Sequence, residues 1–235
     1  MLVVLGPEVG QAQRPRRPPL QQRDEVPANP FKALGDGVRY VARTAWLRGV
    51  FIVLAMVMIA SAVKSPLEPL FVLRTLAKRP KALGLVGAAW GVGMVVGSLH
   101  APSLARKWAR ERLLTLAIGA VGGAVLVASL QRDLPAVLLL WLIAGAGNGA
   151  GTVAYESMLQ ERVPDEVRGR VMAGAGAILD GSFLIGILVA GFLGSALGIR
   201  GALAGSGVLF LAAALAAGRL VRHRVDQPAE VRARG

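Results

Sequence analysis

Six long apolar runs dominate this chain and constrain its fold more than any other feature. A helix needs about 20 consecutive apolar residues to cross about 30 Å of hydrocarbon. Four runs meet this length, whereas the first needs an extension past Lys64 toward Leu73, bent at Pro66 and Pro69, and the last is at the short limit. The runs cover residues 49–63, 82–105, 113–131, 134–155, 171–199 and 201–218. They predict a chain that crosses a membrane six times.

The composition of these runs favours helices over strands. Hydrophobic residues make up 54% of the chain, aromatic residues only 5%, and charged residues 17%, below the roughly 25% of an average soluble protein. The strands of a membrane barrel alternate polar and apolar residues, whereas these runs are continuous and rich in alanine and leucine. We therefore predict an all-α polytopic membrane protein. Its expected spans lie near 49–70, 82–104, 113–131, 135–157, 171–196 and 201–218.

The segments around the spans divide the rest of the chain. Residues 1–30 form a proline- and arginine-rich arm that we expect to be flexible. Residues 31–46 show helical spacing of Phe31, Leu34, Val38 and Val41, which predicts a short amphipathic helix on the cytoplasmic side. The spans occupy a transmembrane domain over 47–220, and a basic tail covers 221–235. The apolar start, Met1–Gly6, is too short for a signal peptide.

The distribution of positive charge predicts the orientation in the membrane. The net charge is +13, and with both ends cytoplasmic 20 of the 27 lysines and arginines lie inside and 7 outside. This split follows the positive-inside rule for a multi-pass protein of the bacterial plasma membrane. The outer segment between the first two spans carries five of the seven, so 71–81 is alternatively an interfacial helix. We expect no nucleic-acid partner, because the charges lie between apolar runs and no recognition motif accompanies them.

Glycines spaced four residues apart predict close helix contacts, because they let helix backbones approach each other in a membrane. The pairs are Gly87/Gly91, Gly93/Gly97, Gly145/Gly149, Gly147/Gly151 and Gly201/Gly205.

Two stretches between the spans carry specific motifs. The first reads Gln-Glu-Arg-Val-Pro-Asp-Glu-Val-Arg-Gly-Arg-Val-Met-Ala over 160–173, in which Pro164 ends a span and Asp165 can cap the next helix. Its motif residues are Pro164, Asp165, Glu166, Arg168, Gly169 and Arg170. The second stretch begins at Gly97 and continues through Arg106, Lys107, Arg110 and Arg112.

These motifs resemble the cytoplasmic loops of the major facilitator superfamily, and most closely those of its enterobactin-exporter and macrolide-efflux branch. A weaker similarity covers 34–41 and 47–48, which resemble the lead-in to the seventh of twelve helices. The resemblance extends over about 31–220 and implies the C-terminal six-helix half. It departs from the family pattern near Ala101, Pro102 and Ser103, where an acidic residue is common. An N-terminal half is also absent from this sequence, so a natural half, a truncated product and a fragment all remain open.

The resemblance implies a function as well as a fold. Its helices would form two inverted three-helix repeats, over 49–131 and 135–218. The activity would be secondary active transport, namely proton-coupled efflux of a small organic molecule. The expected partners are the lipid bilayer, the transported molecule, and an N-terminal six-helix half or a second copy. The alternative is a membrane protein that does not transport, such as a degenerate product or an assembly partner.

Polar residues inside the spans are the candidates for the substrate and proton pathway. Asp180 lies nine residues into the fifth run, where it could couple protons or face a substrate, or else be hydrogen-bonded at a helix contact. Asn148 and Glu156 are further candidates, although packing and a loop-side ion pair are the simpler roles for them. Lys64 and Glu68 are four residues apart and are expected to pair at the outer surface.

Enzymatic and metal-dependent functions find no support in the residues. The chain has no cysteine and two histidines, which excludes thiolate chemistry and Cys-ligated metals and leaves too few ligands for a His-rich site. It lacks the Gly-x-x-x-x-Gly-Lys-Ser/Thr motif for nucleotides. His223 lies in the tail and His100 precedes most candidate serines, so an intramembrane serine–histidine dyad is not formed. We predict no enzyme, no cofactor and no metal.

Overall fold

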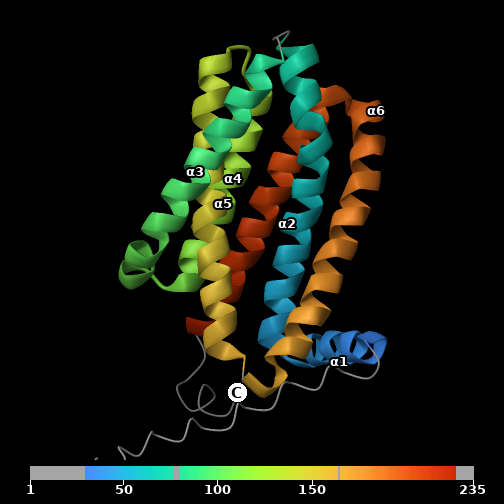
Figure 1. The fold of residues 1–235 in the computed structure, drawn as a ribbon, viewed down its shortest axis with the longest axis vertical. Helices are drawn as coiled ribbons and strands as arrows, with labels where there is room; N and C mark the ends of the chain where they lie inside the picture. The colour runs from blue at the N-terminus through green and yellow to red at the C-terminus, as the bar shows by residue number, and fades with distance from the viewer. Residues whose placement is uncertain (1–29, 77–79, 164, 226–235) are drawn as a thin grey trace, which may run out of the picture.

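The computed structural model describes residues 30–76, 80–163 and 165–225, and gives backbone alone for 30–34, 36, 165–167, 170 and 221–225. These residues are almost entirely helical, with no strand among them. The elements are α1 (Pro30–Arg43), α2 (Ala45–Leu70), the π-helix η1 (Phe71–Thr75), α3 (Lys81–Lys107), α4 (Arg110–Leu130), α5 (Leu134–Arg162) and α6 (Asp165–Val225). Figure 1 shows α2 to α6 along the length of the molecule. The all-α prediction is therefore confirmed.

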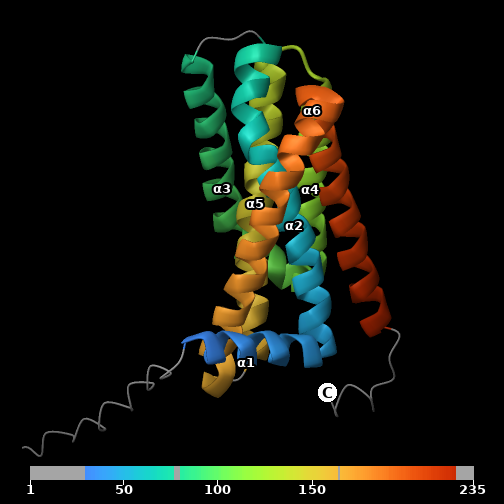
Figure 2. The same ribbon diagram turned by 90° about the vertical axis from the view of Figure 1, so that its right-hand side faces the viewer.

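Helix α1 lies across one end of the bundle, which we call the α1 end (Figures 1 and 2). Val41 is buried there with Leu159, Val163 and Val171. The backbones of α1 and α6 meet at glycines, because a Cβ added at Gly174 would lie 2.6 Å from the Gly37 carbonyl carbon. Apolar burial and this backbone contact hold α1 under the bundle.

Helix α2 continues past its two prolines as a wider π turn. Pro66 and Pro69 lie inside α2 and cannot donate backbone hydrogen bonds. The Phe71 N–H bonds to the carbonyls of Glu68 and Leu67, and η1 then carries the helix to Thr75. The first span is therefore extended, as predicted, and 71–75 continues it instead of forming a separate interfacial helix.

Helix α6 consists of two arms that fold back on each other at Gly198. Gly198 has φ +69° and ψ 175°, a conformation that glycine adopts readily and other residues rarely do. Figure 2 shows the first arm rising and the second descending beside it. These arms trace the fifth and sixth predicted spans. The end of the bundle at this turn is called the bend end.

The helices pack in a definite order. Helix α3 packs on α5, α5 on α4, α4 on α6, and α6 on α2. The second arm of α6 contacts α4 where a Cβ at Gly207 would lie 2.7 Å from the Leu126 nitrogen. It contacts α2 through the Ser206 hydroxyl, which donates to the Ala60 carbonyl at 3.0 Å. This second arm therefore packs against both α4 and α2, and Figure 2 shows it along one edge of the bundle.

The glycine spacing predicted the tightest contact correctly. Ideal Cβ atoms at Gly93, Gly97, Gly145 and Gly149 would lie 2.0–2.3 Å from backbone oxygens of the facing helix, so α3 and α5 touch backbone to backbone. Gly147 and Gly151 meet α4. The same prediction is wrong for Gly87, Gly91 and Gly205, where an added Cβ meets none of the described atoms within 4 Å. At Gly201 it meets, among the described residues, Leu197 of its own helix.

This contact predicts opposite effects for two alanine substitutions. A methyl group at Gly145 would lie 2.2 Å from the Trp90 carbonyl oxygen, so Gly145→Ala should force the helices apart and cost about 1–3 kcal/mol. Gly87→Ala is the matched control, because it enters open space and gains up to about 1 kcal/mol in helix propensity. Thermal unfolding in detergent, followed by circular dichroism, measures both. Equal unfolding temperatures would contradict the close packing of α3 on α5.

Candidate functional site

An ion pair and two tryptophans form a polar cluster inside the apolar bundle. The Lys64 ammonium lies 2.5 Å from Glu68 Oε2, one turn further along α2. It also lies 4.3 Å from the centroid of the Trp90 ring of α3 and 5.6 Å from that of Trp141 of α5. We call these four residues the Lys64 cluster. They link α2 to α3 and α5, although neither of those helices packs extensively on α2.

Lys64 and Trp141 are buried on the bend-end side of the bundle, whereas Glu68 and Trp90 are half-buried. Lys64 is 8% exposed and Trp141 is 0% exposed. Trp141 is seven residues into α5, about 10 Å at 1.5 Å per residue. Two indole faces and a carboxylate around an ammonium combine cation–π attraction with a charge-assisted hydrogen bond. The Trp141 indole N–H has no hydrogen-bond partner in the described part of the chain.

The sequence predicted part of this cluster. Lys64 and Glu68 do pair as expected, but the expected position at the outer surface is wrong. Their turn of α2 faces α3 and α5, so Lys64 is buried. Trp90 and Trp141 were missed, because only helix packing brings residues of three separate spans together. The sequence feature that could have revealed the cluster is a lysine within an apolar span, because a charged side chain there is costly unless it is paired.

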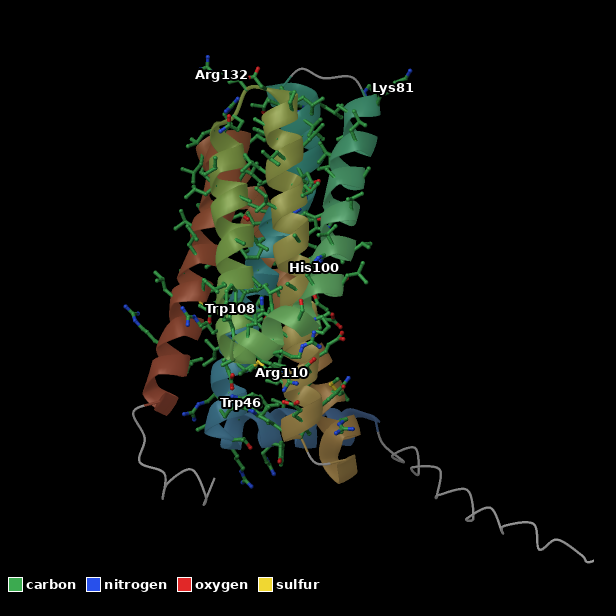
Figure 3. The ribbon with its side chains drawn as sticks, turned by 90° about the vertical axis from the view of Figure 1, so that its left-hand side faces the viewer. Trp46, Lys81, His100, Trp108, Arg110 and Arg132 are labelled. Carbon is green, nitrogen blue, oxygen red and sulfur yellow. The ribbon has the colours of Figure 1, made fainter. Side chains whose placement is uncertain are left out.

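Two reciprocal ion pairs join α4 to α5 at the α1 end. Arg110 pairs with Glu161, and Arg162 pairs with Glu111. The Arg162 guanidinium also lies 4.7 Å from the centroid of the Trp46 ring at the start of α2. Figure 3 shows Arg110 and Trp46 at this end of the molecule. The motif residue Arg110 therefore belongs to a network that fastens three helices where α4 begins and α5 ends.

Those of the remaining loop-motif residues that the structure describes occupy different environments. Arg168 donates to the carbonyls of Gln160 at 2.9 Å and Val163 at 3.1 Å, and so satisfies acceptors that the end of α5 leaves open. Gly97 is buried against α5, whereas Arg106, Lys107 and Gly169 are exposed. Pro164 and the side chains of Asp165, Glu166 and Arg170 lie outside the described residues.

Within the described part of the chain, no ion pair joins any of the three pathway candidates to another residue. Asp180 is exposed on the first arm of α6, and no hydrogen bond or ion pair joins it to another residue that the structure describes. Glu156 is exposed on α5, and Asn148 of the same helix is half-buried. Asp180 lies on α6, whereas Asn148 and Glu156 lie on α5.

No metal centre is formed by the described residues, among which no three histidine or acidic side chains cluster.

The arrangement is a bundle of helices long enough to cross a membrane, with the Lys64–Glu68 ion pair inside it. Two further ion pairs join α4 to α5 at the α1 end. The sequence model of the Major Facilitator Superfamily matches residues 50–235, which includes every helix from α3 to α6. The chain belongs to the Major Facilitator Superfamily. The helical bundle accords with half of the fold of that superfamily, as the sequence predicted.

Curated relatives in the superfamily are multidrug efflux pumps. The chain is 28% identical over 168 residues to the multidrug efflux pump Tap of Mycolicibacterium fortuitum, covering 70% of this chain and 40% of that protein. It is 26% identical over 177 residues to Tap of Mycobacterium tuberculosis strain H37Rv, covering 74% and 41%. The chain thus spans about two fifths of the length of these relatives. No solved structure matches, and the narrower branch suggested by the loop motifs stays a prediction.

The Lys64 cluster predicts a non-additive pair of substitutions. Lys64→Met leaves the Glu68 carboxylate unpaired between helices, which should cost about 2–4 kcal/mol, toward the low end because Glu68 keeps a fifth of its side chain exposed. Lys64→Met with Glu68→Leu removes both charges and should recover most of that loss. The control is Lys81→Met at the exposed start of α3.

Chemical and thermal unfolding in detergent is measured for the unmodified chain, Lys64→Met, the double variant and Lys81→Met. A double variant as unstable as Lys64→Met would show that the ammonium acts through packing alone and not through its pairing with Glu68.

Proposed function

We propose that this chain forms the C-terminal half of a secondary active transporter that exports a small organic molecule in exchange for protons. The Lys64 cluster carries the proposal, because charged groups within membrane spans mark substrate and ion pathways. The chain's membership of the superfamily and the efflux pumps among its relatives also support this proposal. Nothing in this role requires a catalytic residue or a cofactor.

The partner that completes the transporter is an N-terminal six-helix half, or alternatively a second copy. Support comes from the surface of α3 and the first arm of α6, where large apolar side chains are exposed, among them Leu99, Leu188 and Phe192. Asp180 is exposed on the same arm, and an ionised aspartate facing lipid costs about 2.5–3.5 kcal/mol. A partner that provides a polar or aqueous environment would remove this cost.

Within the complete transporter, Asp180 is the proposed proton-coupling or substrate-facing carboxylate. Asn148 and Glu156 extend the proposed pathway along α5 toward the α1 end. The ion pairs of Arg110 and Arg162 hold the inner ends of α4 and α5 while the pathway opens and closes.

Efflux by the assembled protein tests these roles. Cells producing this chain together with the part of M. fortuitum Tap that it does not match should export ethidium, and a protonophore should stop the export. Asp180→Asn should reduce export to the level of cells without the chain, and Asp180→Glu should restore part of it. Asp133→Asn, an exposed carboxylate between α4 and α5, is the control and should leave export unchanged.

Two results would count against the proposal. Export by this chain as a stable monomer would refute the need for a partner. A correctly inserted, assembled complex that exports none of a panel of organic cations, anions and neutral drugs would favour the non-transporting alternative.

The proposed orientation places both chain ends in the cytoplasm. It rests on 20 positive residues on the side of the termini against 7 on the other. Because the chain has no cysteine, single cysteines can be labelled without background. Asp133→Cys should react with an impermeant maleimide in intact cells, and Lys107→Cys only after permeabilisation. The reverse pattern would invert the topology.

A further inference from the structure

A pocket of about 700 Å³ opens at the bend end, beside the turn of α6. Its polar lining includes Thr75, Ser129, Arg132 and Arg200, and its apolar lining includes Leu76 and Leu130. These residues come from the end of η1, the end of α4 with the loop after it, and the bend of α6. The pocket lies at the opposite end of the bundle from the ion pairs of α4 and α5, and on the side where the orientation rule expects few positive charges.

Arg200 is held in place by neighbours that do not neutralise it. It follows the Gly198 bend by two residues and is half-buried. One of its terminal nitrogens donates to the Ser129 carbonyl at 2.8 Å, and its guanidinium carbon lies 5.5 Å from the centroid of the Phe71 ring. Since a guanidinium has five N–H donors, this arrangement fixes its position and leaves donors available to a ligand.

Arg132 provides a second positive charge at the mouth of the pocket. Figure 3 shows it at the bend end, and its side chain is exposed. Within the described part of the chain, neither Arg132 nor Arg200 forms an ion pair, and no carboxylate lines the pocket. Two guanidinium groups facing one cavity without a counter-ion create a site for an anion. The fork geometry of arginine suits the oxygens of a phosphate group.

The surroundings indicate which anion fits. The pocket lies where η1 and α4 end and α6 turns, which is the level of the headgroups for helices of this length. Below it, exposed apolar side chains continue along α4 and the second arm of α6, with Leu130 70% and Val208 54% exposed. A charged mouth above an apolar flank matches a molecule with an anionic head and acyl chains.

We propose that this pocket binds the phosphodiester headgroup of an anionic phospholipid, with Arg132 and Arg200 on the phosphate and the acyl chains along α4 and α6. The lipid would supply the counter-charge that the pocket lining lacks. It would also tie the bend of α6 to the end of α4. This site is separate from the proposed transport pathway.

Lipid binding to the purified full-length chain in neutral detergent tests this site by native mass spectrometry. Phosphatidylglycerol should bind about tenfold more tightly than phosphatidylcholine with the same acyl chains, because only the former carries net negative charge. Arg132→Gln with Arg200→Gln should remove this preference. Arg74→Gln, an exposed arginine of η1 outside the pocket lining, is the matched control and should keep it.

Two further measurements distinguish a lipid site from a site for free phosphate and from a folding defect. Millimolar inorganic phosphate should not displace phosphatidylglycerol, and displacement would mean that the site takes a free phosphate instead of a lipid. If the Arg200 variant does not fold, Arg132→Gln alone decides, because this side chain is exposed and forms no hydrogen bond among the described residues. An unchanged preference for phosphatidylglycerol in Arg132→Gln, or equal binding of both lipids to the unmodified chain, would overturn the proposal.

Discussion

Backbone contact between helices is the interaction on which this bundle depends. Within lipid, burying one apolar side chain against another gains little over leaving it against acyl chains, so helix association relies on close packing. The glycines of α3 and α5 allow carbonyl oxygens to approach positions that any Cβ would occupy. The same device joins α4 to the second arm of α6 and α1 to the first arm. Small residues at crossing points thus determine which helices are neighbours.

The polar groups are distributed along the bundle in three levels. At the α1 end, the pairs Arg110–Glu161 and Arg162–Glu111 fasten α4 to α5. Nearer the bend end, the Lys64 cluster links α2 to α3 and α5 across a gap that their backbones do not close. At the bend itself, Arg200 is positioned but not neutralised. Charges are compensated inside the protein at the first two levels, whereas the third calls for a counter-ion from outside.

The relation to the Major Facilitator Superfamily gives these features a common context. The bundle has two arms of α6 turned at Gly198 and an ion pair on α2 whose lysine is buried against tryptophans of α3 and α5. The chain covers about two fifths of the Tap pumps, and the apolar surface around Asp180 is where we propose the remaining part to pack. The proposed transport pathway and the proposed lipid site are at different places, so each can be tested while the other is left intact.

Sequence alone determined the helical spans, their approximate limits and the local pair of Lys64 and Glu68. Apolar run length and i,i+4 spacing are properties of a single segment, so they can be read without knowing what surrounds it. The extension of the first span past Pro66 and Pro69 was predicted for the same reason. The fifth and sixth spans were also placed correctly on either side of Gly198.

Tertiary structure decided everything that depends on which face of each helix meets a neighbour. Gly87 and Gly91 have the same spacing as Gly93 and Gly97. Of these two pairs only Gly93 and Gly97 contact α5, because they lie on the face of α3 that meets it. Burial of Lys64 beside Trp90 and Trp141 depends on the rotation of α2 relative to α3 and α5. Arg132 and Arg200, 68 positions apart in the chain, share a pocket because Gly198 turns α6 back beside the end of α4. Contacts between residues of different helices depend on how whole helices rotate and pack, so they cannot be predicted from the hydropathy of one segment.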